Sequence, residues 1–75
     1  MYEYDGLLQA RELLLAHETL QAREVLESIS CPSADTLMAL ESLDRKYAPR
    51  EYALGWIDGR LLGFEQYRST INRRV

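Results

Sequence analysis

The sequence has 75 residues, of which 47% are hydrophobic and 28% are charged, and its formal net charge at pH 7 is −3. This composition excludes a disordered chain, and the length predicts one domain, 1–75. A chain this short buries only about 60% of the surface that it exposes when unfolded, so we expect it to gain stability by association.

Residue types that carry chemistry are scarce. His17 is the only histidine and Cys31 the only cysteine, which excludes the usual zinc-binding spacings and an internal disulfide. The serines have no candidate base at a fixed spacing from them. We therefore expect no enzymatic activity, metal or cofactor, with His17 in a surface role and Cys31 as an inert thiol.

Location is predicted from two further patterns. Nowhere does the sequence contain 18 consecutive apolar residues, which argues against a membrane span. Its first residues are acidic and aromatic, unlike the basic and apolar start of a secretory signal. We expect a cytoplasmic protein that does not act at a membrane.

The first predicted helix covers 5–29, a stretch with no proline and with one glycine near its start. Asp5 is placed to cap this helix, and we expect the preceding residues, 1–4, to be frayed. The helix should end within 28–33, because a proline disfavours helical backbone in the residue before it and serines compete for backbone hydrogen bonds.

Apolar residues on this helix form two stripes at helical spacing. The larger stripe, predicted to face the core, comprises Leu7, Leu8, Leu14, Leu15, Ala22, Val25, Leu26 and Ile29. The smaller stripe lies on another side of the helix and comprises Leu13, Ala16 and Leu20. We expect the smaller stripe to form a contact between subunits.

Two further helices follow along the chain. The second covers 33–47, starts with Pro32 in its first turn or with Ser33 as its cap, and carries an apolar stripe of Leu37, Leu40, Leu43 and Tyr47. Pro49 opens the third helix, which covers 49–72. Three amphipathic segments without strand-like alternation predict an all-α protein, an antiparallel three-helix bundle.

The third helix contains glycines at every fourth position, Gly55, Gly59 and Gly63. Each costs roughly 1 kcal/mol relative to alanine in a helix interior, so the three cost about 3 kcal/mol together. Glycines at this spacing share one face, and the usual compensation is the close approach of a second helix. The opposite face carries the apolar stripe predicted to reach the core, namely Leu54, Ile57, Leu61, Phe64 and Ile71.

A chain this short has too few residues to bury a helix on two sides, so we expect a partner to cover one of the two faces. Helices of such unequal length should also leave apolar surface uncovered. We therefore expect a homodimer with Gly55, Gly59 and Gly63 close to its twofold axis.

Aromatic and arginine side chains flank the glycines. Tyr52, Trp56, Arg60 and Tyr67 belong to the residue types that dominate interface hot spots. They either close over a helix contact within the protein or its dimer, or form a surface that recognises another protein. We assign these four residues to the second possibility, a partner-binding site.

Charge is divided unevenly along the sequence. Residues 1–44 contain nine acids and two bases, a net charge of −7, whereas residues 45–75 contain seven bases and three acids, a net charge of +4. The acidic first helix is expected to pair with the basic third one, within the fold or across a dimer. An exposed charge of one sign could instead steer a partner of the opposite sign.

A helix-turn-helix offers a DNA-binding alternative. The second and third predicted helices, joined near 47–50, would present Arg50, Arg60 and Arg68 from the recognition helix. However, the middle of that helix consists of glycines and apolar residues, and the chain is net acidic, whereas DNA binding depends on neutralising phosphates. Both features argue against nucleic acid as the partner.

As a compact acidic all-helical chain without an enzyme motif, the sequence resembles the small accessory proteins by which bacteriophages bind and inhibit host proteins, including quorum-sensing anti-activators and anti-CRISPR proteins. The resemblance rests on size, composition and helical plan, so it carries over no site residue. It implies inhibition by covering a surface that the target needs. The favoured function is a homodimeric protein-binding inhibitor or adaptor; a small DNA-associated regulator and a structural assembly subunit are the alternatives.

Overall fold

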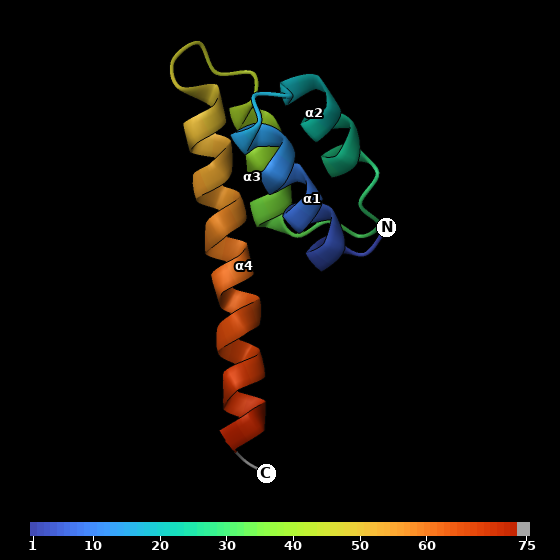
Figure 1. The fold of residues 1–75 in the computed structure, drawn as a ribbon, viewed down its shortest axis with the longest axis vertical. Helices are drawn as coiled ribbons and strands as arrows, with labels where there is room; N and C mark the ends of the chain where they lie inside the picture. Colours follow the sequence, from blue (N-terminus) through green and yellow to red (C-terminus); the bar gives the residue numbers. More distant parts are fainter. Residues whose placement is uncertain (74–75) are drawn as a thin grey trace.

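The computed structural model describes the backbone of residues 1–73 and the side chains of residues 1–67. It contains four helices, α1 (Glu3–Leu15), α2 (Thr19–Glu27), α3 (Ala34–Ser42) and α4 (Pro49–Arg73), and no strand within the described backbone. The three shorter helices gather beside the first part of α4, which continues beyond them (Figure 1). The all-α prediction is confirmed, but the prediction of three helices is wrong.

The predicted helix over 5–29 is broken by a turn at His17. His17 has a φ of 63°, its N–H donates to the Leu14 carbonyl at 3.1 Å, and the Glu18 N–H donates to the Leu13 carbonyl at 2.8 Å. These two bonds, with the first donor His17 itself in the left-handed conformation, are the Schellman motif that ends many helices. The chain can then reverse, so that α2 packs against α1 (Figure 1).

The residues before α1 are held in place, contrary to the expected fraying. The Ser30 N–H donates to the Met1 carbonyl at 2.9 Å, which ties the start of the chain to the connection between α2 and α3. Gly6 lies against this connection: a Cβ atom there would lie 2.5 Å from Cγ1 of Ile29. Glycine at this position therefore permits a close contact that alanine would obstruct.

The second predicted helix is shorter than expected, because α3 ends at Ser42 and not near residue 47. The N–H groups of Leu43, Asp44 and Arg45 each donate to the carbonyl three residues earlier. This is the hydrogen-bond pattern of a 3₁₀ turn, so the α-helix ends before it. Ala48, with a φ of 48°, then turns the chain into α4. At the other end, the Ser33 hydroxyl accepts a hydrogen bond from the Thr36 N–H, so Ser33 is the cap.

All four helices contribute to one core. Its buried apolar residues are Leu7, Ala10, Leu14, Ala22, Leu26, Ile29, Ala39, Leu43, Ala53, Ile57 and Leu61. Leu8 and Leu15, predicted to belong to the core, are exposed instead. The prediction chose the core-facing side for one continuous helix of 25 residues. Because α1 instead ends at the turn, it buries a different stripe, Leu7, Ala10 and Leu14.

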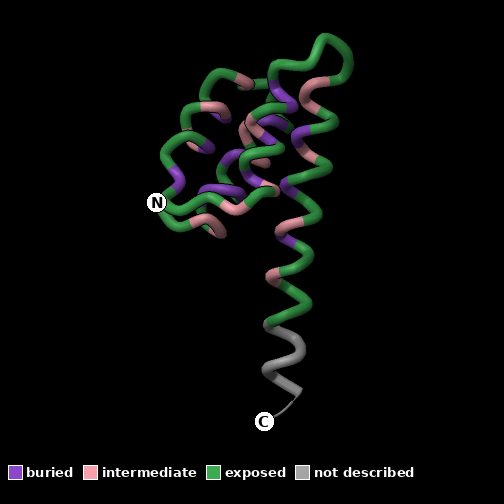
Figure 2. The backbone as a smooth tube through the Cα atoms, turned by 180° about the vertical axis from the view of Figure 1, so that it is seen from behind, coloured by how far each residue is buried: buried purple, intermediate pink, exposed green. Residues whose placement is uncertain are grey.

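Helix α4 begins at Pro49 as predicted and ends one residue later than predicted. Its buried residues, Ala53, Ile57 and Leu61, face the shorter helices, and its other sides are largely exposed (Figure 2). Leu54 and Phe64 are partly buried against the same core. Ile71, the last residue of the predicted stripe, lies outside the described side chains. Among the described residues, no helix combines the length and apolar character needed to cross a membrane.

Candidate protein-binding face

One side of α4 faces away from the body of the protein, and we call it the outer face. It comprises Tyr52, Gly55, Trp56, Gly59, Leu62, Gly63 and Tyr67, all of which are exposed. The spacing of three and four residues puts them along one side of the helix. Large apolar side chains are therefore presented to solvent in a row, with the glycines between them.

The three glycines of the outer face are not required by packing within the chain. A Cβ atom at Gly55, Gly59 or Gly63 would meet nothing within 4 Å, in contrast to one at Gly6. Alanine would fit at all three positions and would favour the helix by about 1 kcal/mol each. Their cost to α4 is thus not offset by any contact among the described side chains.

A groove between α3 and α4 adjoins this face. It is lined by Met38, Glu41, Ser42, Asp44, Arg45, Tyr52 and Trp56 and has a volume of about 450 Å³. The Arg45 guanidinium lies 3.9 Å from the centre of the Tyr52 ring, a cation–π contact. Tyr52 and Trp56 therefore belong to both the outer face and the α3–α4 groove, as neighbours of a methionine and two carboxylates.

The α3 side of this groove was not predicted. The second predicted helix was given an apolar stripe of Leu37, Leu40, Leu43 and Tyr47, but Leu37 and Tyr47 are exposed. Helix α3 buries the small side chains of Thr36, Ala39 and Ser42, and its Leu37 and Met38 are exposed, whereas Leu40 is partly buried against the core. No motif marks this; the signal is the small residues at spacings of three, at positions 36, 39 and 42.

Arg60 does not join the outer face with its neighbours. Its Nε donates to Oε1 of Glu3 at 2.9 Å, and its guanidinium lies 4.6 Å from the centre of the Phe64 ring. Arg60 is therefore engaged within the fold, although its side chain is 38% exposed, and its assignment to a partner-binding surface stays a prediction. A helical wheel shows the side on which a long side chain leaves the helix but not the tertiary contact that it makes.

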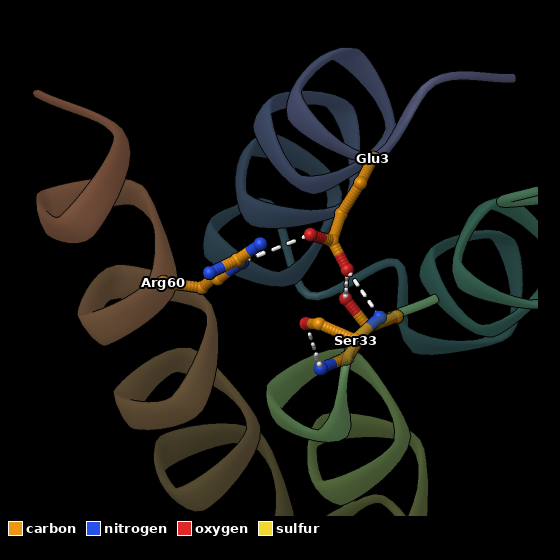
Figure 3. Close-up of polar contacts among 4 residues, drawn as sticks. Glu3, Ser33 and Arg60 are labelled. Atoms are coloured by element: carbon orange, nitrogen blue, oxygen red, sulfur yellow. Dashed lines mark hydrogen bonds and ion pairs between the residues drawn. The ribbon is translucent and has the colours of Figure 1, made fainter. Parts of the chain in front are cut away.

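Glu3 connects three helices through one carboxylate, which we call the Glu3 clamp (Figure 3). Oε2 accepts from the Ser33 N–H at 2.6 Å and from the Thr36 hydroxyl at 2.7 Å, while Oε1 accepts from Arg60. Burial by itself would raise the pKa of Glu3, but these hydrogen bonds outweigh it and lower the pKa from 4.5 to about 2. The clamp fixes α4 relative to the start of α3, and these two helices are the walls of the α3–α4 groove.

The second stripe predicted for a subunit contact, Leu13 and Leu20, is not one surface. Leu13 lies in α1 and is partly buried against the core, whereas Leu20 lies in α2 with 75% of its surface exposed. The turn at His17 separates them. A continuous stripe across 13–20 therefore cannot form, and only Leu20 remains as an exposed side chain.

The arginines of the proposed recognition helix also turn inwards. Arg50 donates from Nη1 to the Leu14 carbonyl at 3.2 Å, and Arg60 belongs to the Glu3 clamp. The side chain of Arg68 lies outside the described residues. Two of the three arginines assigned to DNA readout are thus engaged within the fold.

The expected pairing of an acidic first helix with a basic third one holds for one ion pair and is reversed in another. Glu3 of α1 pairs with Arg60 of α4, but Arg11 of α1 pairs with Asp58 of α4 at 2.8 Å. Among the described residues, no group of three histidine, cysteine or acidic side chains is placed to hold a metal ion. His17 and Cys31 are exposed, and both have positive φ, so each marks a turn.

Comparison with known proteins gives no relative. No protein-family model, curated protein or solved structure matches this chain.

Proposed function

We propose that this protein is a non-enzymatic protein-binding module that acts as a homodimer. The observation that carries the proposal is the outer face of α4, where exposed Tyr52, Trp56, Leu62 and Tyr67 stand around glycines with open space above them. The glycines weaken α4 by about 3 kcal/mol without a described contact in return. Close approach of a second helix would use that space and would remove the apolar side chains from water.

A partner protein is proposed for the surface that remains beside this contact. Trp56 borders both the outer face and the α3–α4 groove, next to Tyr52 and Met38. Tryptophan and tyrosine bury a large area at a low cost in side-chain entropy, so they are common anchors in interfaces. In this proposal the protein works in the cytoplasm as an inhibitor or adaptor and acts by covering a surface of its target, as the resemblance to small phage inhibitors implies.

The dimer is tested with the substitution Gly59→Leu at the centre of the outer face. A Cβ atom at position 59 would meet nothing within 4 Å in the single chain, and leucine favours the helix over glycine, so a solvent-exposed face would give a more stable protein of unchanged mass. We expect instead that light scattering shows loss of the dimer. Gln21→Leu, which adds an exposed leucine on α2, is the matched control and should leave the dimer intact.

The partner surface is tested with Trp56→Ala. We expect a target captured from the native host to bind this variant more than about tenfold less tightly, while the variant stays dimeric. Unchanged affinity in an intact dimer would remove Trp56 from the recognition surface. Nuclease treatment during capture is the control for the DNA alternative, since partners bridged by nucleic acid would be lost.

A further inference from the structure

One side of α1 is left uncovered by the other helices and presents acidic and apolar side chains in alternation. We call it the α1 stripe, and it comprises Asp5, Leu8, Glu12 and Leu15, at successive spacings of three, four and three residues. This spacing puts all four side chains on one side of the helix. All four residues are exposed, Leu8 to 40% and Leu15 to 48%. The two leucines therefore stay in water, while α1 packs on the body through another side.

Two hollows adjoin the α1 stripe and meet at Leu8. The first has a volume of about 520 Å³ and is lined by Met1, Tyr2, Asp5, Leu8, Gln9 and Glu12. The second lies between α1 and α4, has a volume of about 450 Å³ and is lined by Leu8, Arg11, Asp58, Leu61, Leu62 and Glu65. Neither hollow includes Trp56 or any residue of α3, so a partner bound here leaves the α3–α4 groove open.

The negative charge of the α1 stripe is not neutralised within the fold. Among the described side chains, those of Asp5 and Glu12 take part in no hydrogen bond or ion pair. The amino group of Met1, beside the first hollow, donates to the Ser30 hydroxyl at 3.5 Å. The arginines that belong to α1 or reach it are each paired with a carboxylate, Arg11 with Asp58 at 2.8 Å, Arg60 with Glu3 at 2.9 Å and Arg50 with Glu51 at 3.4 Å. The carboxylates of the stripe are therefore open to an incoming cation.

We infer that the α1 stripe is a second docking surface, which takes a basic amphipathic helix of another protein lying antiparallel to α1. Asp5 and Glu12 are two helical turns apart, roughly 10 Å. Two basic side chains at the same spacing on the partner would meet both carboxylates, while an apolar side chain between them packs on Leu8. The matching pattern on the partner is L-x-x-K-x-x-x-L-x-x-K, in which the last lysine lies towards the end of the helix that favours cations.

The charge of the stripe argues against other occupants. Its unpaired carboxylates repel the phosphates of nucleic acids and the anionic surface of a membrane. A second copy that docked through the same stripe about a twofold axis would set acids against acids. The inference does not depend on the proposed homodimer, because the stripe lies on α1 and the outer face lies on α4.

A helical peptide with the matching pattern tests the inference. An alanine-rich peptide of about 18 residues that carries L-x-x-K-x-x-x-L-x-x-K is titrated into the isotope-labelled chain, and the chemical shifts of the backbone amides are followed. We expect the amides of residues 5–15 to shift most, and the affinity to fall as sodium chloride is raised. A peptide of the same composition, with its lysines on the opposite side of the helix from its leucines, should bind more than about threefold less tightly.

Substitutions on the stripe separate a specific contact from the overall acidity of the chain. Asp5→Asn combined with Glu12→Gln should weaken binding of the peptide by more than about threefold, and so should Leu8→Ala. Glu24→Gln combined with Glu27→Gln is the matched control, since it makes the same change in net charge at exposed positions of α2. This control should leave the affinity unchanged.

Equal weakening by the two pairs of substitutions would show that the peptide responds only to the net charge of the chain, and would overturn the inference. Amide shifts that gather along the α3–α4 groove or on the outer face would do the same. Amides of residues 5–15 that shift when the chain is diluted without peptide would place a second copy on the stripe and would also contradict it. The mass of the unmodified chain bears on the proposed homodimer alone, so the two proposals can fail separately.

Discussion

Replacing the carboxylate of the Glu3 clamp should destabilise the fold in a pH-dependent way. In Glu3→Gln an amide NH₂ takes the place of one carboxylate oxygen, so it faces either the Arg60 donor or the Ser33 and Thr36 donors. At least one donor then loses its acceptor, and the ion pair with Arg60 is lost as well. Both effects lower the free energy of unfolding.

The magnitude follows from the pKa of Glu3, which is lowered from 4.5 to about 2. At about 1.36 kcal/mol for each pKa unit, the shift corresponds to at most about 3.5 kcal/mol of stability. The side chain is 11% exposed, so screening by solvent removes little of this value. Because the folded-state pKa is lowered, the contribution is complete above pH 4.5 and is lost as the pH falls towards 2.

Urea unfolding of the unmodified chain and of Glu3→Gln tests this, with Asp5→Asn as the control because Asp5 is an exposed carboxylate on the same turn of α1. We expect Glu3→Gln to lose about 2–3 kcal/mol at pH 7 and the difference from the unmodified chain to shrink between pH 5 and pH 2. Asp5→Asn should change stability by less than about 0.5 kcal/mol. A difference for Glu3→Gln that is the same at pH 7 and pH 2.5 would refute the role of the ionised clamp.

Three substitutions probe the backbone. Gly6→Ala should destabilise by about 1–3 kcal/mol although alanine favours helices, since its Cβ would overlap Ile29; equal or higher stability in thermal unfolding would contradict the close contact. Gly63→Ala, the same change where space is open, should raise stability by about 0.5–1 kcal/mol at concentrations where the protein is monomeric, and a loss there would place an unseen contact at Gly63. His17→Gly should stabilise by up to about 1 kcal/mol because φ at this turn is 63°, and a lower melting temperature would argue against the left-handed turn.

The sequence was informative where local signals are strong. Pro49 and the spacing of Ile57, Leu61 and Phe64 predicted α4 and its core side, and the same wheel correctly placed the glycines on the opposite, exposed side. Use of that side for binding stays a prediction. The turn at His17 was missed because neither glycine nor proline marks it, and the left-handed conformation is held by backbone hydrogen bonds that any residue except proline could make.

Features that depend on contacts between residues far apart in the sequence could not be predicted from local residue patterns. Glu3 lies in a segment that was expected to fray, and its importance comes from Ser33 and Arg60, which are 30 and 57 residues away along the chain. The same contact withdraws Arg60 from the outer face. The α3–α4 groove was likewise hidden, because the outward side of α3 depends on where that short helix packs and not on its own apolar spacing.

Sedimentation equilibrium of the unmodified chain at micromolar concentration tests the central claim most directly, namely that the outer face of α4 is a contact surface. The account requires a mass of twice the 8.7 kDa of one chain, with a dissociation constant at or below the micromolar range. A single species of 8.7 kDa at that concentration would contradict it.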